Sequence, residues 1–361
     1  MKIIKVAAII SLLAATIFMS SYKYETKDDA LSDFSDILPE GEALEDGEEL
    51  SKKLGIDAVL SELITAMSLG LPDAVSLFLL LLGISALAMA AASSPPFENS
   101  AFSSHISMAT AAVASLLIFS RLFPIYESVK EGIESISTFF GAAVPVLTGV
   151  LYAGGELNSA ASGAVGMNIT LGVITYVTSK LLLPLSCAVF ALALLSGIDT
   201  GSVSALAKRF KGFFMWALGI ITTVLVASFS MQSLISGASD TAYLRTAKYA
   251  ASGMIPIVGS TVSSALGTLA GGLSYAKNII GIGSVAVIGS VAILPLVKLL
   301  LFRLAFSLAI SFADFLGTTE VNKTFTAFRD ALDVLLSVYV MTTVVYIFEI
   351  IVLIRCGGSI F

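Results

Sequence analysis

Five charged residues lie within or at the edges of long apolar stretches of this chain, where charge is costly. They are Lys180, Lys298, Arg303, Asp314 and Glu349. Ionisable side chains at membrane depth normally face a bundle interior or a water-filled cavity, and they pair with another group. These residue types therefore indicate ion pairing along an interior or water-lined surface, and they are the candidate intramembrane charges.

The spacing of these charges restricts how they can pair. Arg303 and Asp314 are eleven residues apart, about three helical turns, so they share a helix face but cannot touch. Each is therefore expected to find a partner on another helix. Lys298 and Glu349 lie near the ends of apolar stretches, and we expect their side chains to extend towards the membrane surface.

Residues for conventional catalysis are sparse. The sequence has one histidine, His105, and two cysteines, Cys187 and Cys356. They form no spacing typical of a metal site, and no nucleophile can be matched with a base. A Walker loop is also missing from the sequence, so an energy source would have to lie in another chain. The sequence predicts a protein that is not an enzyme, with no cofactor, no metal and no nucleic-acid partner.

Glycine and proline mark a second group of candidate residues, for a conduit or for close packing: Pro145, Pro184, Pro256, Gly259 and Pro295. Pro145 and Pro184 are 39 residues apart, as are Pro256 and Pro295, so the pairs are compatible with an internal repeat or with chance similarity. We expect residues 141–164 and 253–278 to be broken or re-entrant. In lipid, such backbone is stable only where protein buries it or where it lines a wet cavity.

Composition defines the elements that must position these residues. The 361 residues are 57% hydrophobic and 13% charged, against about a quarter charged in soluble domains. This predicts an all-α polytopic membrane helical bundle of about seven spans, within a range of six to eight. The expected spans are residues 74–92, 106–123, 181–198, 213–231, 279–297, 299–316 and 334–354, with residues 164–179 as an eighth candidate.

The N-terminal region differs in character from the rest. Residues 1–21 combine Lys2 and Lys5 with a short apolar run, which predicts a signal peptide, with an uncleaved anchor as the alternative. Residues 22–69 carry thirteen Asp or Glu against four Lys, a net charge of −9. They are expected to form an acidic extracytoplasmic leader, in which an apolar stripe at 56–67 suggests an interfacial or partner-binding helix. Residues 70–361 form the multi-pass transmembrane domain.

Two amphipathic stretches lie between the expected spans. One runs from Ile125 to Phe140 and the other from Lys323 to Leu335, each with an apolar stripe opposite charged residues. Both are expected to lie at the membrane surface.

Part of the sequence resembles a known family. The resemblance rests on Ala247-Lys248-Tyr249-Ala250, Ile255-Pro256-Ile257-Val258-Gly259, Val262-Ser263-Ser264-Ala265, Lys277-Asn278, Gly281 and Leu294-Pro295-Leu296-Val297-Lys298. This region is similar to the signature of the stage III sporulation protein AE family of endospore-forming bacteria. The order of export signal, acidic leader and multi-pass region is also similar.

The resemblance implies a role in sporulation. Members lie in the mother-cell membrane around the forespore and belong to a transenvelope channel complex. The implied partners are other stage III A operon proteins, including a cytoplasmic ATPase, and the stage II sporulation protein Q complex. In that setting the chain would be a permease-like or gate element, alone or as a homo-oligomer. The alternatives are a non-conducting assembly platform for the same complex and a free-standing secondary transporter.

Overall fold

The structure is a computed structural model in which six helical segments are long and apolar enough to cross a membrane. It describes residues 56–92, 100–153, 157–196, 203, 205–227 and 259–356. The predicted multi-pass helical bundle is thereby confirmed. The six segments are Leu60–Ala91, Met108–Ala153, Leu157–Leu195, Ala205–Ala227, Ile279–Phe315 and Thr319–Val352. The signal peptide, most of the acidic leader and Pro256 lie outside the described residues.

The chain divides into two units at Thr65. Of the first unit the structure describes residues 56–65, which begin helix α4 (Ile56–Ala92). The second unit contains the remainder of α4 and the other helices of the described residues. They are α5 (Ser100–Ala153), α6 (Leu157–Tyr176), η2 (Val177–Leu182), α7 (Leu183–Leu195), the helix Ala205–Ala227, α9 (Gly259–Phe315) and α10 (Thr319–Cys356).

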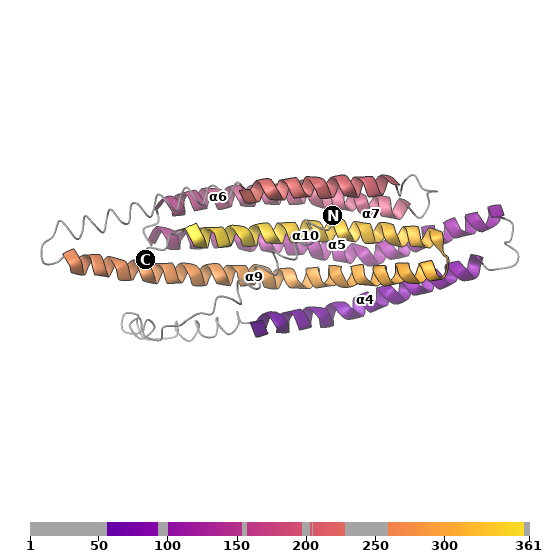
Figure 1. Ribbon diagram of the computed structural model, residues 1–361, viewed down its shortest axis with the longest axis horizontal. Coiled ribbons are helices and arrows are strands. Elements are labelled where there is room, and N and C mark those ends of the chain that lie inside the picture. The colour runs from indigo at the N-terminus through magenta and orange to yellow at the C-terminus, as the bar shows by residue number, and fades with distance from the viewer. Residues whose placement is uncertain are drawn as a thin grey trace. The chain divides into compact units, whose positions relative to one another are not determined.

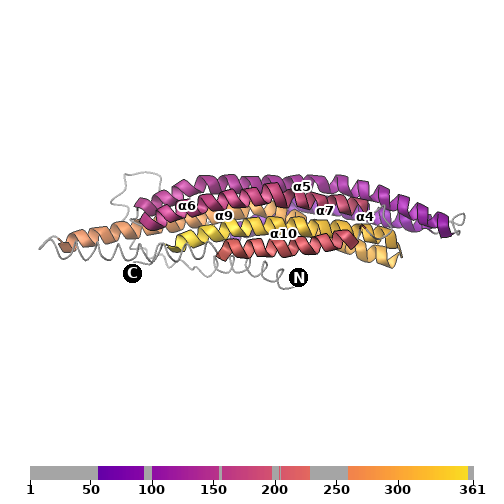
Figure 2. The ribbon, with the colours of Figure 1, turned by 90° about the horizontal axis from the view of Figure 1, so that it is seen from above.

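Helix α10 lies at the centre of the second unit, where it contacts α5, α6, α7 and α9 (Figures 1 and 2). Its apolar stripe is fully buried, with Phe325, Phe328, Leu332 and Leu335 at most 1% exposed. The stripe of α5 from Ile125 to Phe140 is buried as well. The sequence therefore identified both stripes correctly, but other helices cover them where a membrane surface was expected to do so. They pack against other helices and form the core, where burial of apolar area stabilises the bundle.

Helix α9 corrects the number of spans. Residues 279–297 and 299–316 were expected to be separate crossings, but they belong to one helix of 57 residues that continues through Pro295. A proline inside a helix leaves the carbonyl four residues earlier without its usual donor. Here that carbonyl belongs to Val291, and the Tyr339 hydroxyl of α10 donates to it at 3.5 Å. The neighbouring helix thus compensates for Pro295, and the helix does not break.

The interruption of regular helix occurs at Pro184 rather than at Pro145. Helix α5 continues through Pro145 and ends at Ala153, and α6 begins at Leu157, so within residues 141–164 helix ends eight residues after the proline. In residues 253–278, α9 is helical from Gly259, so the described part of that segment is not broken. Directly before Pro184 the helix widens into the π-helical η2, where the Leu183 N–H bonds to the Thr178 carbonyl five residues earlier. Turns of this kind often occur at functional sites. Residues 164–179 accordingly continue into α7 rather than forming an eighth span.

A tight connection joins α9 to α10. Gly317 has φ of +70°, in the left-handed region that glycine adopts without strain. The Gly317 N–H bonds to the Asp314 carbonyl and the Thr318 N–H to the Ala313 carbonyl, both at 3.1 Å, which is the pattern of a Schellman cap. Asp314 also accepts a hydrogen bond from the Asn322 side chain across the turn. Asp314 therefore belongs to the α9–α10 connection and is exposed there.

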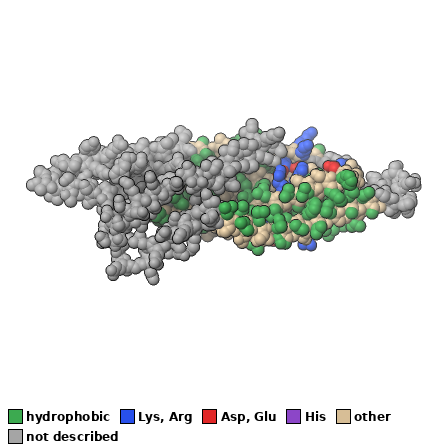
Figure 3. Space-filling view, turned by 60° about the horizontal axis from the view of Figure 1, so that its bottom comes forward, with side chains coloured by type: hydrophobic (Ala, Val, Ile, Leu, Met, Phe, Trp, Pro, Cys, Tyr) green, Lys and Arg blue, Asp and Glu red, His purple; other side chains and the backbone are tan. Residues whose placement is uncertain are grey.

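The outer surface of the bundle is rich in apolar side chains. Figure 3 shows one face on which hydrophobic side chains cover much of the described area, while charged side chains gather in one region. On α4, Leu71, Val75 and Leu79 are between 47% and 61% exposed. Such a surface suits contact with lipid or with other membrane helices.

Candidate functional site

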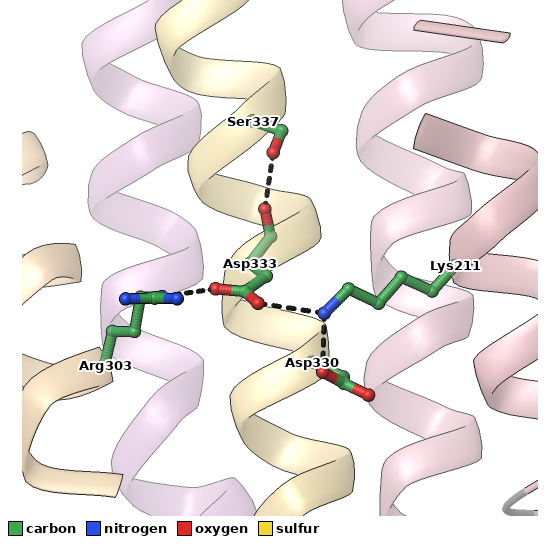
Figure 4. Close-up of polar contacts among 5 residues, drawn as sticks. All are labelled: Lys211, Arg303, Asp330, Asp333 and Ser337. Atoms are coloured by element: carbon green, nitrogen blue, oxygen red, sulfur yellow. Dashed lines mark hydrogen bonds and ion pairs between the residues drawn. The ribbon is translucent and has the colours of Figure 1, made fainter. Parts of the chain in front are cut away.

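Four charged side chains from three helices form one cluster, which we call the charge cluster: Lys211, Arg303, Asp330 and Asp333. Lys211 comes from the helix Ala205–Ala227, Arg303 from α9 and both aspartates from α10 (Figure 4). The Lys211 Nζ lies 2.5 Å from Asp330 Oδ1 and 2.9 Å from Asp333 Oδ2. The Arg303 Nε donates to Asp333 Oδ1 at 2.5 Å. Asp333 thus joins both cations.

The charge cluster is electrically balanced and largely withdrawn from solvent. The side chains of Lys211 and Asp333 are 10% and 11% exposed. The backbone of Asp333 is held in place by Ser337, whose hydroxyl donates to the Asp333 carbonyl at 2.7 Å. Two positive and two negative charges cancel, so each charge has a partner inside the bundle. The side chains of Asp330 and Arg303 are more exposed, at 24% and 36%, so removal of a member is expected to cost most at the buried Lys211 and Asp333.

Lys211 lies on the least buried of the six membrane-length segments. Only 17% of the apolar window of Ala205–Ala227 is buried, against 61% for α10. Its neighbours Phe213 and Trp216 are 66% and 62% exposed. Phe214 and Leu218 of this helix are buried, at 3% and 6% exposed, so the two ion pairs of Lys211 act together with a narrow apolar contact in holding the helix.

A second polar region, the hydroxyl groove, lies between α5, α6, η2 and α10. It encloses about 300 Å³ and is lined by Ile133, Glu134, Ser137, Thr138, Ile174, Thr175, Ser179 and Tyr346. Ser137 Oγ lies 2.8 Å from Thr175 Oγ1, and the Tyr346 hydroxyl donates to Ser137 Oγ at 3.2 Å. Deeper in the bundle, Thr178 and Thr342 approach each other at 3.3 Å. Hydroxyl groups therefore line one route between the helices.

The structure places the five sequence-predicted charges at five separate locations. Arg303 is in the charge cluster, and Asp314 is in the α9–α10 connection. Lys298 pairs with Asp73 of α4 at 3.2 Å. Lys180 is exposed on η2, beside the hydroxyl groove that Ser179 lines. Glu349 is 4% exposed and receives a hydrogen bond from Thr170 at 2.7 Å, so its expected reach to the membrane surface is wrong.

The predicted proline and glycine residues also lie at different places in the structure. Pro184 lies in the first turn of α7, directly after η2, and Pro295 lies where α5, α9 and α10 meet around Tyr339. Pro145 lies within α5, and Gly259 is the first residue of α9. The described residues therefore do not bring these positions together into a single site.

Three members of the charge cluster were missed by sequence reasoning: Lys211, Asp330 and Asp333. Asp330 and Asp333 lie opposite the apolar stripe of the stretch Lys323 to Leu335, and the sequence does not single out Lys211. A signal was present, because two acids three residues apart face the same side of a helix directly before an apolar stretch. What the sequence lacked was the identity of the helix that covers them.

Metal or cofactor binding has no support in the side chains that the structure describes. Among these residues, no group of three or more His, Cys, Asp or Glu could hold a metal ion. The two cations in the charge cluster already occupy the Asp330 and Asp333 carboxylates. The chemistry open to this arrangement is therefore ion pairing, proton exchange and hydrogen bonding to a polar solute.

Comparison with known proteins gives one consistent result. A family model described as "Stage III sporulation protein AE" matches residues 36–357. A curated relative, "Stage III sporulation protein AE" of Bacillus subtilis (strain 168), is 27% identical over 191 residues. The match covers 52% of this chain and 47% of the relative, so the chain spans about half the length of the curated relative it matches. No solved structure matches.

Proposed function

Since this chain belongs to the stage III sporulation protein AE family, we propose that it is the permease-like or gate element of a transenvelope channel complex between mother cell and forespore. It is a multi-pass membrane protein of sporulation. The proposed location is the mother-cell membrane around the forespore, with the N-terminal segment outside the cytoplasm.

The observation that carries this proposal is the attachment of the helix Ala205–Ala227 through Lys211. Charges at membrane depth are retained where they serve a pathway or a switch. Here the ion pairs of Lys211 connect the least buried of the six segments, Ala205–Ala227, to the most buried one, which is part of α10. Since Lys211 provides two of the three ion pairs, outward movement of its helix would break both at once. The cluster thus has the properties of a latch on a movable helix.

The hydroxyl groove supports a conducting role over the platform alternative. A non-conducting platform predicts a dry, closely packed core with its charges at the rim. Polar oxygens of Ser137, Thr175 and Tyr346 instead line a cavity of about 300 Å³, with Glu134 at its wall. Hydroxyl and carboxylate groups can replace part of the hydration of a polar solute, as in other membrane pathways.

Partners follow from the family and from the chain's lack of a nucleotide-binding motif. We propose that the other stage III A operon proteins and the stage II sporulation protein Q complex surround this bundle. A cytoplasmic ATPase among them would supply energy. The exposed apolar side chains of α4, including Leu79, provide a surface for such partners or for a second copy.

Cysteine accessibility tests whether the groove lines water. Single cysteines at Ser137, Thr175 and Ser179 would be placed in full-length protein in which Cys187 and Cys356 are replaced. Membranes of sporulating cells would then be treated with a membrane-impermeant thiol reagent. If the groove belongs to a water-filled path, the reagent labels all three cysteines. The labelling is expected to be stronger in Lys211→Met, where the helix Ala205–Ala227 is released, than in protein with an intact charge cluster.

Matched controls make the result decisive. Cysteine at Leu147, which is 1% exposed in the core of α5, should stay unlabelled in every background. Cysteine at Glu131, on the exposed face of α5, reports overall access of the reagent. If Ser137, Thr175 and Ser179 remain as protected as Leu147, the groove is dry and the platform alternative replaces the gate.

A further inference from the structure

Glu349 is a buried carboxyl that the latch does not use. It lies on α10, 16 residues beyond Asp333, and is 4% exposed. Its Oε1 lies 2.7 Å from the Thr170 Oγ1 of α6. Its Oε2 is buried and has no hydrogen-bond partner in the described part of the chain. An ionised carboxylate prefers several donors or a cation, and Glu349 has neither arrangement here.

Thr170 has one hydroxyl hydrogen for two neighbouring acceptors, and this distinguishes the protonated from the ionised form of Glu349. The Thr170 Oγ1 also lies 2.9 Å from the Gly166 carbonyl, which can only accept. A threonine hydroxyl has a single hydrogen but two acceptor lone pairs. If Glu349 is ionised, Thr170 must divide that hydrogen between two acceptors. If Glu349 carries a proton, it donates to Thr170, and Thr170 donates to Gly166, so both contacts are satisfied.

The charged groups on the surrounding helices do not supply a counter-ion among the described side chains. The described parts of α6 and α7 contain no charged residue, and in α9 before Lys298 the one charged residue is Lys277, whose side chain lies outside the described part of the chain. Lys180 of η2 is exposed and lies two residues after Thr178. Thr178 contacts Thr342, which is about two helical turns from Glu349 along α10. On α5 the facing charge is Glu134, which is negative and lies at the groove. A proton is therefore the positive charge that this site can accommodate.

A hydroxyl group connected to the groove lies one helical turn from Glu349. Tyr346 lies three residues before Glu349, on the same side of α10. Its hydroxyl donates to Ser137 Oγ at 3.2 Å and lies 3.4 Å from Thr175 Oγ1. Ser137, Thr175 and Tyr346 all line the hydroxyl groove. Tyr346 thus lies one turn of α10 from the buried carboxyl and is hydrogen-bonded to the hydroxyls of the groove.

From this geometry we propose that Glu349 is a proton-binding site, which exchanges its proton with the hydroxyl groove through Tyr346 and Ser137. The site gives the bundle a protonatable group in its last span, through which a proton could be coupled to movement of the helices. Its existence does not require that the bundle conduct a larger solute.

Dicyclohexylcarbodiimide tests the proton directly in the unmodified protein. This lipophilic reagent adds a protonated carboxyl across a C=N bond: the carboxyl oxygen bonds to the central carbon and the proton moves to nitrogen. The O-acylisourea then rearranges to a stable N-acylurea. The full-length protein in membranes would be labelled at mildly acidic and alkaline pH, and the modified residue located by peptide mass spectrometry. We expect Glu349 to be labelled at least tenfold more than the exposed Glu131 and Glu134, with labelling lost at alkaline pH.

Two results would overturn the proposal. Labelling of Glu131 and Glu134 without Glu349 would mean that Glu349 is ionised or paired. Protection of Glu349 by sodium ions at constant pH would mean that the occupant is a metal cation rather than a proton. Glu349→Gln, which keeps the shape of the side chain, should abolish the adduct without lowering the amount of folded protein.

Infrared spectroscopy tests the exchange route. The C=O stretching band of a protonated carboxyl shifts when its hydrogen is replaced by deuterium, and Glu349→Gln identifies the band. We expect Tyr346→Phe to slow this shift at least fivefold after transfer to heavy water, while Thr138→Val, at the groove but outside the hydroxyl chain, leaves it unchanged. An unchanged rate in Tyr346→Phe would remove Tyr346 from the route.

Discussion

Asp333→Asn is expected to destabilise the bundle by about 1.5–3 kcal/mol, the range for hydrogen bonds to charged groups, because Arg303 loses its ion pair while Lys211 keeps Asp330. The Asp333 carboxylate forms ion pairs with Arg303 Nε at 2.5 Å and with Lys211 Nζ at 2.9 Å, and its side chain is 11% exposed. Asparagine preserves the shape but removes the negative charge, and its amide group would face one of the two cations. The measurement is unfolding of the purified protein in detergent, followed by circular dichroism during titration with a denaturing detergent.

Asp330→Asn is the matched control. It removes the same charge one turn earlier on the same helix, but its side chain is 24% exposed and Asp333 still neutralises Lys211. We expect a loss of about 1 kcal/mol, as for a partly exposed ion pair. If Asp333→Asn were no more harmful than Asp330→Asn, the cluster would not be organised around Asp333.

Replacing the whole cluster separates stability from function. With Met at Lys211 and Arg303 and Leu at Asp330 and Asp333, no charge remains unpaired, and such replacements are often neutral or stabilising. We therefore expect a stable protein that accumulates in the membrane but gives few spores. Normal spore yield from this variant, in a host lacking its own family member, would show that the charges are not needed for gating.

The sequence predicted the fold class and the core stripes because both depend on local periodicity. Ile125, Val129 and Ile136 recur at helical spacing, and all three are buried. Hydropathy likewise located the membrane segments. It could not distinguish a surface helix from a core helix, since an amphipathic stripe looks the same whether membrane or another helix covers it.

Helix continuity and charge pairing depended on contacts that are distant in the sequence. Pro295 predicts a break, yet the helix continues where Tyr339, 44 residues away, donates to the freed carbonyl of Val291. Lys298 pairs with Asp73, 225 residues away. Periodicity on one helix does not reveal such partners. The sequence could therefore nominate Arg303 as an interior charge, but it could not supply Lys211 or Asp333.

Gly132→Leu is expected to be the most damaging change in the uncharged core. A Cβ added at Gly132 would lie 2.9 Å from the Tyr339 hydroxyl oxygen, 3.1 Å from its Cε2 and 3.4 Å from Pro295 Cγ. Tyr339 is 1% exposed, and its hydroxyl is the donor to Val291, so it cannot move aside without releasing that carbonyl. Gly132 therefore permits the close approach of α5 to the Pro295 region of α9 and to α10.

Overpacking of a dense core costs about 1–3 kcal/mol, and a leucine at this contact is expected at the upper end of that range. Gly149→Leu provides the control on the same helix, because nothing lies within 4 Å of a Cβ at Gly149. There the gain in helix propensity over glycine, about 0.8–1 kcal/mol, is not offset by a clash. The same denaturation measurement should thus give opposite signs for the two substitutions. Equal tolerance of leucine at both positions would mean that α5 does not pack against Tyr339 at this distance, and the explanation for the continuity of α9 through Pro295 would fail with it.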